Sequence, residues 1–193
     1  MTAKKQQLQI NKAVEALQQG DVIAYPTEAV YGLGCDPNNI PAVKKILELK
    51  QREKEKGLIL IAANFEQLKP YLLPLEKPIE KKLLESWNNA DKPVTWIVPA
   101  KEEVSEYVKG KFNSVAVRVS HHPIVKQLCE NFSGAIISTS ANIAAKEAAR
   151  TSEQAKDIFG DEIEHVIEGE TNIDASPSEI RDAITDNIIR QSN

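Results

Sequence analysis

The unbroken apolar run at 58–63, LILIAA, is the feature that most constrains the fold. Such a run is typical of a strand buried on both faces, which requires helices on both sides of a sheet. Amphipathic patterns predict these helices at 4–19, 41–50, 64–72, 76–87, 122–132 and 152–160. Further strands are predicted at 22–27, 93–100, 114–120 and 135–141, with short strands within 165–170 and 178–191. We therefore expect an α/β or α+β fold, a twisted mixed sheet flanked by helices, in one domain over 1–193.

The charge of the chain is distributed unevenly. A formal net charge of −4 at pH 7 argues against a globally basic nucleic-acid coat protein. Between residues 44 and 56, however, six lysines and arginines stand against three glutamates. A cationic island on an acidic protein indicates a localised anionic ligand. The N-terminal residues lack an apolar segment of signal-peptide type, so we expect a cytoplasmic protein in which Cys35 and Cys129 are free thiols.

Part of this island shows a regular spacing, with cations at every second position: Lys50, Arg52, Lys54 and Lys56. In an extended backbone these side chains would share one side and form a row that could clasp a polyphosphate. Alternatively, the helix over 41–50 continues to a cap at Gly57 and carries solvated charges on its outside. The chain contains no GxxxxGK[ST] loop, so a nucleotide would have to be bound by another device.

Hydroxyl and amide side chains cluster where the predicted strand at 135–141 ends, as Ser138, Thr139, Ser140 and Asn142. Such groups can hydrogen-bond phosphate, ribose or carboxylate oxygens without adding charge, and ligands of α/β folds commonly bind at strand ends. An ordinary turn cap, in which the same side chains bond to nearby backbone, is the alternative.

Two further segments contain candidate binding residues. AYPTEAVYGLGCDP, at 24–37, has Thr27 at a strand end and Tyr31 among glycines that allow the backbone to approach a ligand closely. Arg118 interrupts a valine-rich strand in which Ser114, Ala116 and Arg118 share one face. A guanidinium suits a carboxylate because its fork can bind both oxygens.

Taken together, these segments resemble the YrdC/TsaC family of threonylcarbamoyl-AMP synthases. The resemblance is carried by AYPTEAVYGLGCDP, LKQREKEKGLILIAANFEQLKPYL, AVRVSHHP, IISTSAN, SPSEIRDAI and the terminal IIRQ, in family order over nearly the whole chain. It implies a YrdC-like fold with a basic concave face. It also implies that L-threonine, bicarbonate or carbon dioxide, and ATP give threonylcarbamoyladenylate and pyrophosphate, with Mg²⁺ assisting at the phosphates. Partner proteins would then use the adenylate to modify adenosine 37 of tRNAs that read ANN codons.

The resemblance also implies roles for particular residues. The catalytic cations would be Lys50, Arg52 and Lys56, and ATP would be bound by these together with Ser114, Ser140, Asn142 and Arg190. Threonine would be bound by Thr27, Tyr31, Arg118, Ser138 and Ser178. Two departures concern the phosphate side: Glu53 stands where the family often has proline, and the glycine usual after the late arginine is missing.

Two other functions use the same residues. The cationic face could belong to a module that binds structured or double-stranded RNA, for example in ribosome maturation, by shape and phosphate contacts. The pocket could also belong to an unrelated carbamoyl or acyl transferase that acts on another amine. Release of pyrophosphate without RNA separates the first from the synthase, and a panel of amino acids separates the second.

Overall fold

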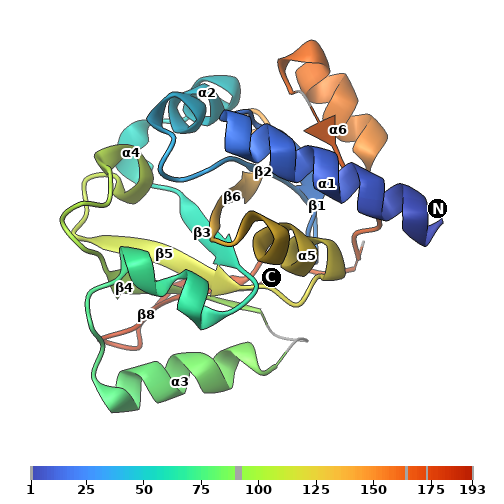
Figure 1. The fold of residues 1–193 in the computed structure, drawn as a ribbon. Coiled ribbons are helices and arrows are strands. Elements are labelled where there is room, and N and C mark those ends of the chain that lie inside the picture. Colours follow the sequence, from blue (N-terminus) through green and yellow to red (C-terminus); the bar gives the residue numbers. More distant parts are fainter. Residues whose placement is uncertain (1, 90–92, 164, 173, 193) are drawn as a thin grey trace.

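A mixed β-sheet runs through the molecule and is covered by helices (Figure 1). The computed structural model describes residues 2–89, 93–163, 165–172 and 174–192. Its strands are β1 (Ile23–Pro26), β2 (Tyr31–Gly34), β3 (Ile59–Ala62), β4 (Val94–Pro99), β5 (Ser114–Val119), β6 (Ile136–Ser140), β7 (His165–Val166), β8 (Glu179–Asp182) and β9 (Ile188–Arg190). Their order in the sheet is β7-β1-β2-β6-β3-β5-β4-β8-β9. The predicted mixed sheet flanked by helices is therefore confirmed.

Helices lie between most of these strands along the chain. They are α1 (Ala3–Gln19), α2 (Ile40–Lys50), α3 (Lys77–Trp87), α4 (Glu106–Lys109), α5 (Pro123–Phe132) and α6 (Ser152–Phe159), with short 3₁₀ turns η1 (Lys54–Lys56), η2 (Phe65–Gln67), η3 (Lys69–Tyr71) and η4 (Gly160–Glu162). Thr2 and Asn39 cap the N-termini of α1 and α2, because their side chains accept hydrogen bonds from backbone N–H groups of the first helical turn. Both helices lie where their amphipathic patterns predicted them. No described helix is both long and apolar enough to cross a bilayer.

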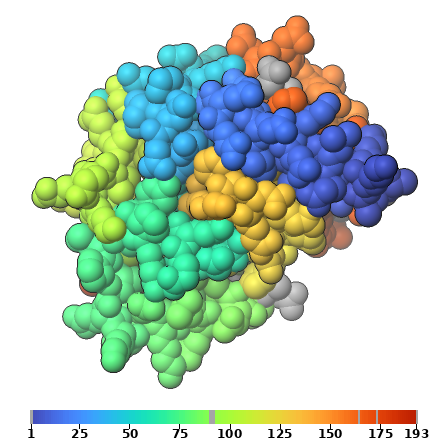
Figure 2. Space-filling model, in the orientation of Figure 1, coloured from blue at the N-terminus to red at the C-terminus, as the bar shows by residue number. Residues whose placement is uncertain are grey.

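Alternate residues of the strands face two separate hydrophobic cores. Leu60, Val117 and Ile137 belong to the larger core, which α2, α3, α4 and α6 cover. Ile61 and Ile136 point to the other face and pack with α1 and α5 in the smaller core. Figure 2 shows α1 in blue and α5 in gold closing one side of the molecule. The apolar run at 58–63 is thus buried on both faces, as predicted.

The two cysteines lie in different cores. Cys35 follows β2 in the larger core, Cys129 lies on α5 in the smaller core, and both are buried free thiols. Burial raises the pKa of Cys129 to about 12, and it raises the pKa of Cys35 as well. Neither thiol is therefore ionised to a useful extent at neutral pH.

The structure corrects two sequence-based expectations and adds one strand that the sequence did not predict. The backbone from Lys50 to Lys56 is not extended: Lys50 ends α2, Gln51 adopts a left-handed conformation with φ 50°, and 54–56 form a 3₁₀ turn. The helix predicted over 64–72 is two 3₁₀ turns, because Pro70 cannot donate a helical hydrogen bond. The glycine-rich segment 31–34 is a strand, β2, which pairs with both β1 and β6.

Candidate functional site

A cavity of about 680 Å³ opens on the sheet face that α1 and α5 cover only in part. Strand alternation places Ser114, Arg118 and Ser138 on this face, with their valine and isoleucine neighbours turned into the larger core. The cavity is lined by these predicted site residues: Thr27, Tyr31, Arg52, Lys56, Ser114, Arg118, Ser138, Ser140, Asn142, Ser178 and Arg190. Residues from six distant parts of the chain therefore meet at one site, and of the predicted set Lys50 is not in the lining.

The turn after α2 supplies two cations to the cavity. Arg52 donates to the carbonyl of Gly57 from Nε at 3.3 Å and from Nη2 at 2.9 Å. These bonds fix its guanidinium, and no acidic side chain of the described residues pairs with its charge. Burial lowers the pKa of Arg52, but an arginine stays protonated. Lys56 lies 3.2 Å from Glu53, the residue that replaces the family proline, in an exposed pair. Water screens such a pair, so Lys56 remains available to an anion.

Lys54 and Lys50 do not join this pair in a row. The ammonium of Lys54 lies 3.2 Å from a carboxylate oxygen of Glu106 on α4, outside the cavity. Lys50 is only 3% exposed, and its ammonium donates to the carbonyl of Ser140 at 2.5 Å, the carbonyl of Asn142 at 2.8 Å and Asn142 Oδ1 at 3.0 Å. The row of four cations is thus replaced by Arg52 and Lys56 at the cavity and Lys50 beneath the turn after β6.

The turn after β6 is rigidly constructed. Ser140 Oγ donates to Asn142 Oδ1 at 2.6 Å, while Asn142 Nδ2 donates to the carbonyls of Ile143 and Lys146 at 3.0 and 2.7 Å. Gly32 on β2 pairs with Ser140, which joins the turn to the sheet. The side chains therefore make the turn cap, and Ser140 and Asn142 also line the cavity; their contact with a ligand remains a prediction.

Arg118, on β5, is 9% exposed and forms an ion pair with Glu28. The Arg118 Nη2 to Glu28 Oε2 distance is 3.1 Å. Glu28 Oε1 accepts hydrogen bonds from Ser120 Oγ at 2.7 Å and from the backbone N–H of His121 at 3.3 Å. Burial raises the pKa of Glu28, but Arg118 and the Ser120 hydroxyl outweigh it and lower that pKa to about 2. The carboxylate is therefore charged at neutral pH.

Four more predicted residues have defined environments. Ser138 and Ser114 line the cavity from β6 and β5. Thr27 Oγ1 donates to the carbonyl of Val30 at 2.7 Å and closes the turn between β1 and β2. Tyr31 is fully buried, and its hydroxyl donates to the carbonyl of Gly169 at 2.9 Å and accepts from the N–H of Gly169 at 3.0 Å. Thr27 and Tyr31 thus shape the wall.

The β8–β9 hairpin completes the cavity. Ser178, just before β8, shares a hydrogen bond of 2.8 Å with Thr95, and its carbonyl accepts from Arg190 Nη2 at 2.7 Å. Burial and the nearby positive charge of Arg118 lower the pKa of Arg190. Arg190 therefore reaches the cavity although the following glycine is missing.

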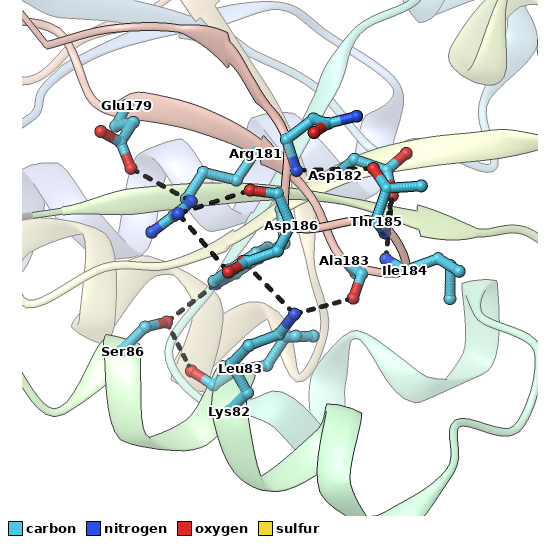
Figure 3. A network of polar contacts seen from close by, with 12 residues as sticks. Lys82, Leu83, Ser86, Glu179, Arg181, Asp182, Ala183, Ile184, Thr185 and Asp186 are labelled. Atoms are coloured by element: carbon cyan, nitrogen blue, oxygen red, sulfur yellow. Dashed lines mark hydrogen bonds and ion pairs between the residues drawn. The ribbon is translucent and has the colours of Figure 1, made fainter.

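Helix α3 and strand β4 hold this hairpin in place (Figure 3). Lys82 Nζ donates to the carbonyl of Ala183 at 3.0 Å and lies 3.4 Å from a carboxylate oxygen of Asp186. Arg181 Nη2 lies 3.5 Å from the other oxygen of Asp186. The Lys82 ammonium and the Arg181 guanidinium also lie 5.0 and 5.7 Å from the ring centroid of Trp96, within the range of cation–π attraction.

Sequence reasoning missed several lining residues. Lys109 and Lys146 add positive charge, so six cationic side chains line the cavity against two acidic ones, Glu28 and Asp182. Glu28 had a sequence signal, because the lone Arg118 in a valine-rich strand requires an anionic partner. Within the described residues, no group of three histidines, cysteines or acidic residues could hold a metal ion. These residues do not fit a magnesium site built by the protein alone.

Comparisons with known proteins converge on one family. A family model described as Sua5_yciO_yrdC, telomere recombination, matches residues 15–192. The threonylcarbamoyl-AMP synthase of Photobacterium profundum is 47% identical over 184 residues, which is 94% of this chain and 98% of that protein. A structure of H234A/Y235A P. abyssi Sua5 superposes with a TM-score of 0.88 at 30% identity, covering 95% of this chain and 56% of the other.

A second structure is of P. abyssi Sua5 complexed with L-threonine. It has a TM-score of 0.81 and 33% identity, covering 90% of this chain and 50% of the other. The present chain thus spans about half the length of these Sua5 chains, whereas it matches nearly the full length of the Photobacterium protein.

Proposed function

This chain belongs to the Sua5/YciO/YrdC family, and from that premise we propose that it is a threonylcarbamoyl-AMP synthase. The observation that carries the proposal is one cavity that combines a buried arginine suited to a carboxylate with cations suited to a triphosphate. The reaction joins L-threonine, bicarbonate or carbon dioxide, and ATP into threonylcarbamoyladenylate and releases pyrophosphate. The product is passed to partner proteins that modify adenosine 37 of tRNAs reading ANN codons.

The threonine end of the cavity lies at Arg118. Its guanidinium binds the α-carboxylate, and the hydroxyls of Ser138 and Ser178 provide uncharged hydrogen-bonding groups beside it. Thr27 and Tyr31 shape the wall around the side chain. The complex of P. abyssi Sua5 with L-threonine supports this assignment, since that protein shares the fold and a third of the aligned residues.

The ATP end lies at the turns after α2 and β6. Arg52 and Lys56 bind the phosphates, with Arg190 approaching from the hairpin, while Ser140, Asn142 and Ser114 contact the nucleotide. Lys50 supports this end from beneath the turn. Any Mg²⁺ comes with the triphosphate, because the described residues offer no metal cluster of their own.

The chemistry requires alignment rather than a protein nucleophile. The amine of threonine attacks carbon dioxide to form a carbamate, whose oxygen then attacks the α-phosphorus and expels pyrophosphate. Holding both substrates in one cavity makes the second step effectively intramolecular. Arg52 and Lys56 stabilise the negative charge that develops on the departing pyrophosphate. The reaction uses metabolites of the cytoplasm, where we place the protein.

The test is a reaction with purified protein, ATP, L-threonine, bicarbonate and magnesium, without RNA. We expect release of pyrophosphate together with threonylcarbamoyladenylate, identified by its mass. Omission of threonine or bicarbonate should abolish both signals, and serine should be a poorer substrate. An RNA-binding module would retain RNA and yield no pyrophosphate, so that result would reject the proposal.

A further inference from the structure

Glu28 has no assigned role, yet it joins two parts of the sheet across the cavity. It lies in the turn between β1 and β2, whereas its partners Arg118, Ser120 and His121 lie at the end of β5. Strands β1 and β5 are separated in the sheet by β2, β6 and β3. The carboxylate is held by three neighbours, and its Oε2 atom is buried against Arg118 without any hydrogen bond. Such a buried charge requires its partner to stay in place.

The carboxylate also sets the charge at that end of the cavity. Arg52 and Arg190 bond to carbonyl groups, which leave their positive charges uncompensated. Lys56 pairs with the exposed, solvent-screened Glu53, its one acidic partner among the residues that the structure describes. Arg118, by contrast, faces a buried carboxylate at 3.1 Å. A polyphosphate near Arg118 would meet the repulsion of Glu28, whereas at Arg52 it would not.

The two proposed substrates also differ in charge. ATP carries several negative charges, and an amino acid carries one carboxylate and one ammonium group. A pair of opposite charges matches an amino acid and is a poor site for a triphosphate. We propose that Glu28 is a positioning and specificity residue. Its carboxylate orients the Arg118 guanidinium toward the amino-acid carboxylate and repels phosphate groups from it. This inference rests on the proposed function and adds how the cavity directs threonine and ATP to different ends.

The experiment measures substrate competition in Glu28→Gln, which keeps the shape of the side chain and removes its charge. In the wild type, pyrophosphate should not weaken binding of L-threonine, measured by calorimetry. In the variant, we expect about a tenfold weaker affinity for L-threonine, the scale of a lost charged partner, and further weakening as pyrophosphate is added. The KM for threonine should rise with ATP concentration, while the KM for ATP changes little.

Two more variants keep the test interpretable. Glu28→Asp retains the charge on a shorter side chain, so pyrophosphate should still fail to compete even if threonine binds more weakly. Glu168→Gln is the matched control, because Glu168 pairs with Lys5 at 2.8 Å outside the cavity and should behave as wild type. Thermal unfolding checks that each variant is folded. If Glu28→Gln fails to fold, the comparison of Glu28→Asp with Ser120→Ala, which removes one hydrogen bond to the carboxylate, takes its place.

Two results would overturn the inference. One is unchanged threonine affinity in folded Glu28→Gln, and the other is an equal loss of affinity for threonine and ATP. If Glu28→Gln does not fold, competition by pyrophosphate in Glu28→Asp would overturn it. Failure of the proposed function is distinguishable, since it would show as wild-type protein that releases no pyrophosphate.

Discussion

The ammonium of Lys50 binds the turn after β6 and does not line the cavity. The three N–H groups of an ammonium meet three oxygens of the turn after β6, at Ser140 and Asn142. Burial, with the positive charge of Arg52, lowers the pKa of Lys50 to about 8, so most of the population is still protonated at pH 7. The side chain therefore ties the end of α2 to the turn that carries Asn142, and acts on the nucleotide through that turn.

We expect Lys50→Met to lower the free energy of unfolding by about 2 kcal/mol, because three part-buried oxygens of Ser140 and Asn142 lose their donor. Urea unfolding measures this loss. Lys12→Met, at an exposed position of α1, is the control and should change stability by less than about 0.5 kcal/mol. A Lys50→Met protein as stable as the wild type would show that the hydrogen bonds of Lys50 do not contribute to the free energy of unfolding.

Arg52 lines the cavity with an uncompensated charge, and Lys54 nearby does not line it. We expect Arg52→Ala to slow adenylate formation on the order of 100-fold, the scale of losing one group that stabilises charge in the transition state. Lys54→Ala removes a cation that is paired with Glu106, so it should leave the rate within about twofold. Pyrophosphate release under saturating substrates measures both. Equal rates for Arg52→Ala and the wild type would remove Arg52 from the mechanism.

At the scale of helices and strands, the sequence predicted those elements whose own pattern decides their structure. Helices α1, α2, α3 and α5 have apolar stripes, and strands β3 to β6 have apolar or alternating runs. Strand β2, with sequence YGLG, has low intrinsic strand preference, and it forms because β1 and β6 flank it. The cation spacing from Lys50 to Lys56 was misleading, because Gln51 ends the helix and breaks the alternation.

The site was predictable to the extent that its residues lie on regular strands. Ser114 and Arg118 share a face by simple alternation, and Ser138 and Ser140 do the same on β6. Arg118 on β5 pairs with Glu28 in the β1–β2 turn, and strands β6 and β3 stand between them in the sheet, so local sequence patterns do not encode this contact. The inward direction of Lys50 depends likewise on the position of the β6 turn above α2.

The hairpin β8–β9 offers a prediction at the same scale. Lys82→Met removes its contacts with Ala183 and Asp186, so Arg190 should be held less firmly at the cavity. We expect a several-fold higher KM for ATP and a stability loss of about 1 kcal/mol, the usual value of such a hydrogen bond. Steady-state kinetics and urea unfolding measure the two effects. Lys81→Met, whose side chain is 75% exposed on the same helix, is the control. Identical kinetics for the two variants would show that the position of the β8–β9 hairpin does not affect ATP binding.

At the scale of the whole molecule, the sheet separates two cores, and the cavity occupies the part of one face that α1 and α5 leave open. Buried charges at the cavity make stability depend on pH. In the acid range, one contribution comes from Glu28, whose pKa in the folded protein is about 2 against an ordinary value of 4.5. The unfolded chain binds more protons between these values, so stability falls as pH drops from about 4.5 to about 2.

We expect the stability gap between the wild type and Glu28→Gln to narrow on acidification. The pH-dependent part of the gap should be on the order of 3 kcal/mol, because one pKa unit corresponds to about 1.4 kcal/mol. Urea unfolding at pH 7 and at about pH 3 should show about 2 kcal/mol of this change, because a carboxylate with a pKa of about 2 is still mostly ionised at pH 3. A gap of the same size at both pH values would mean that Arg118 and Ser120 do not depress this pKa.

The placement of one thiol in each core offers a way to follow how the molecule opens. Cys35 and Cys129 are buried on opposite faces of the sheet, so an alkylating reagent can reach each only when its own layer loosens. Mass spectrometry of peptides after timed labelling would time the exposure of both layers within one sample. Simultaneous labelling would identify cooperative opening of the two layers, whereas earlier labelling of Cys129 would show that α1 and α5 lift away first.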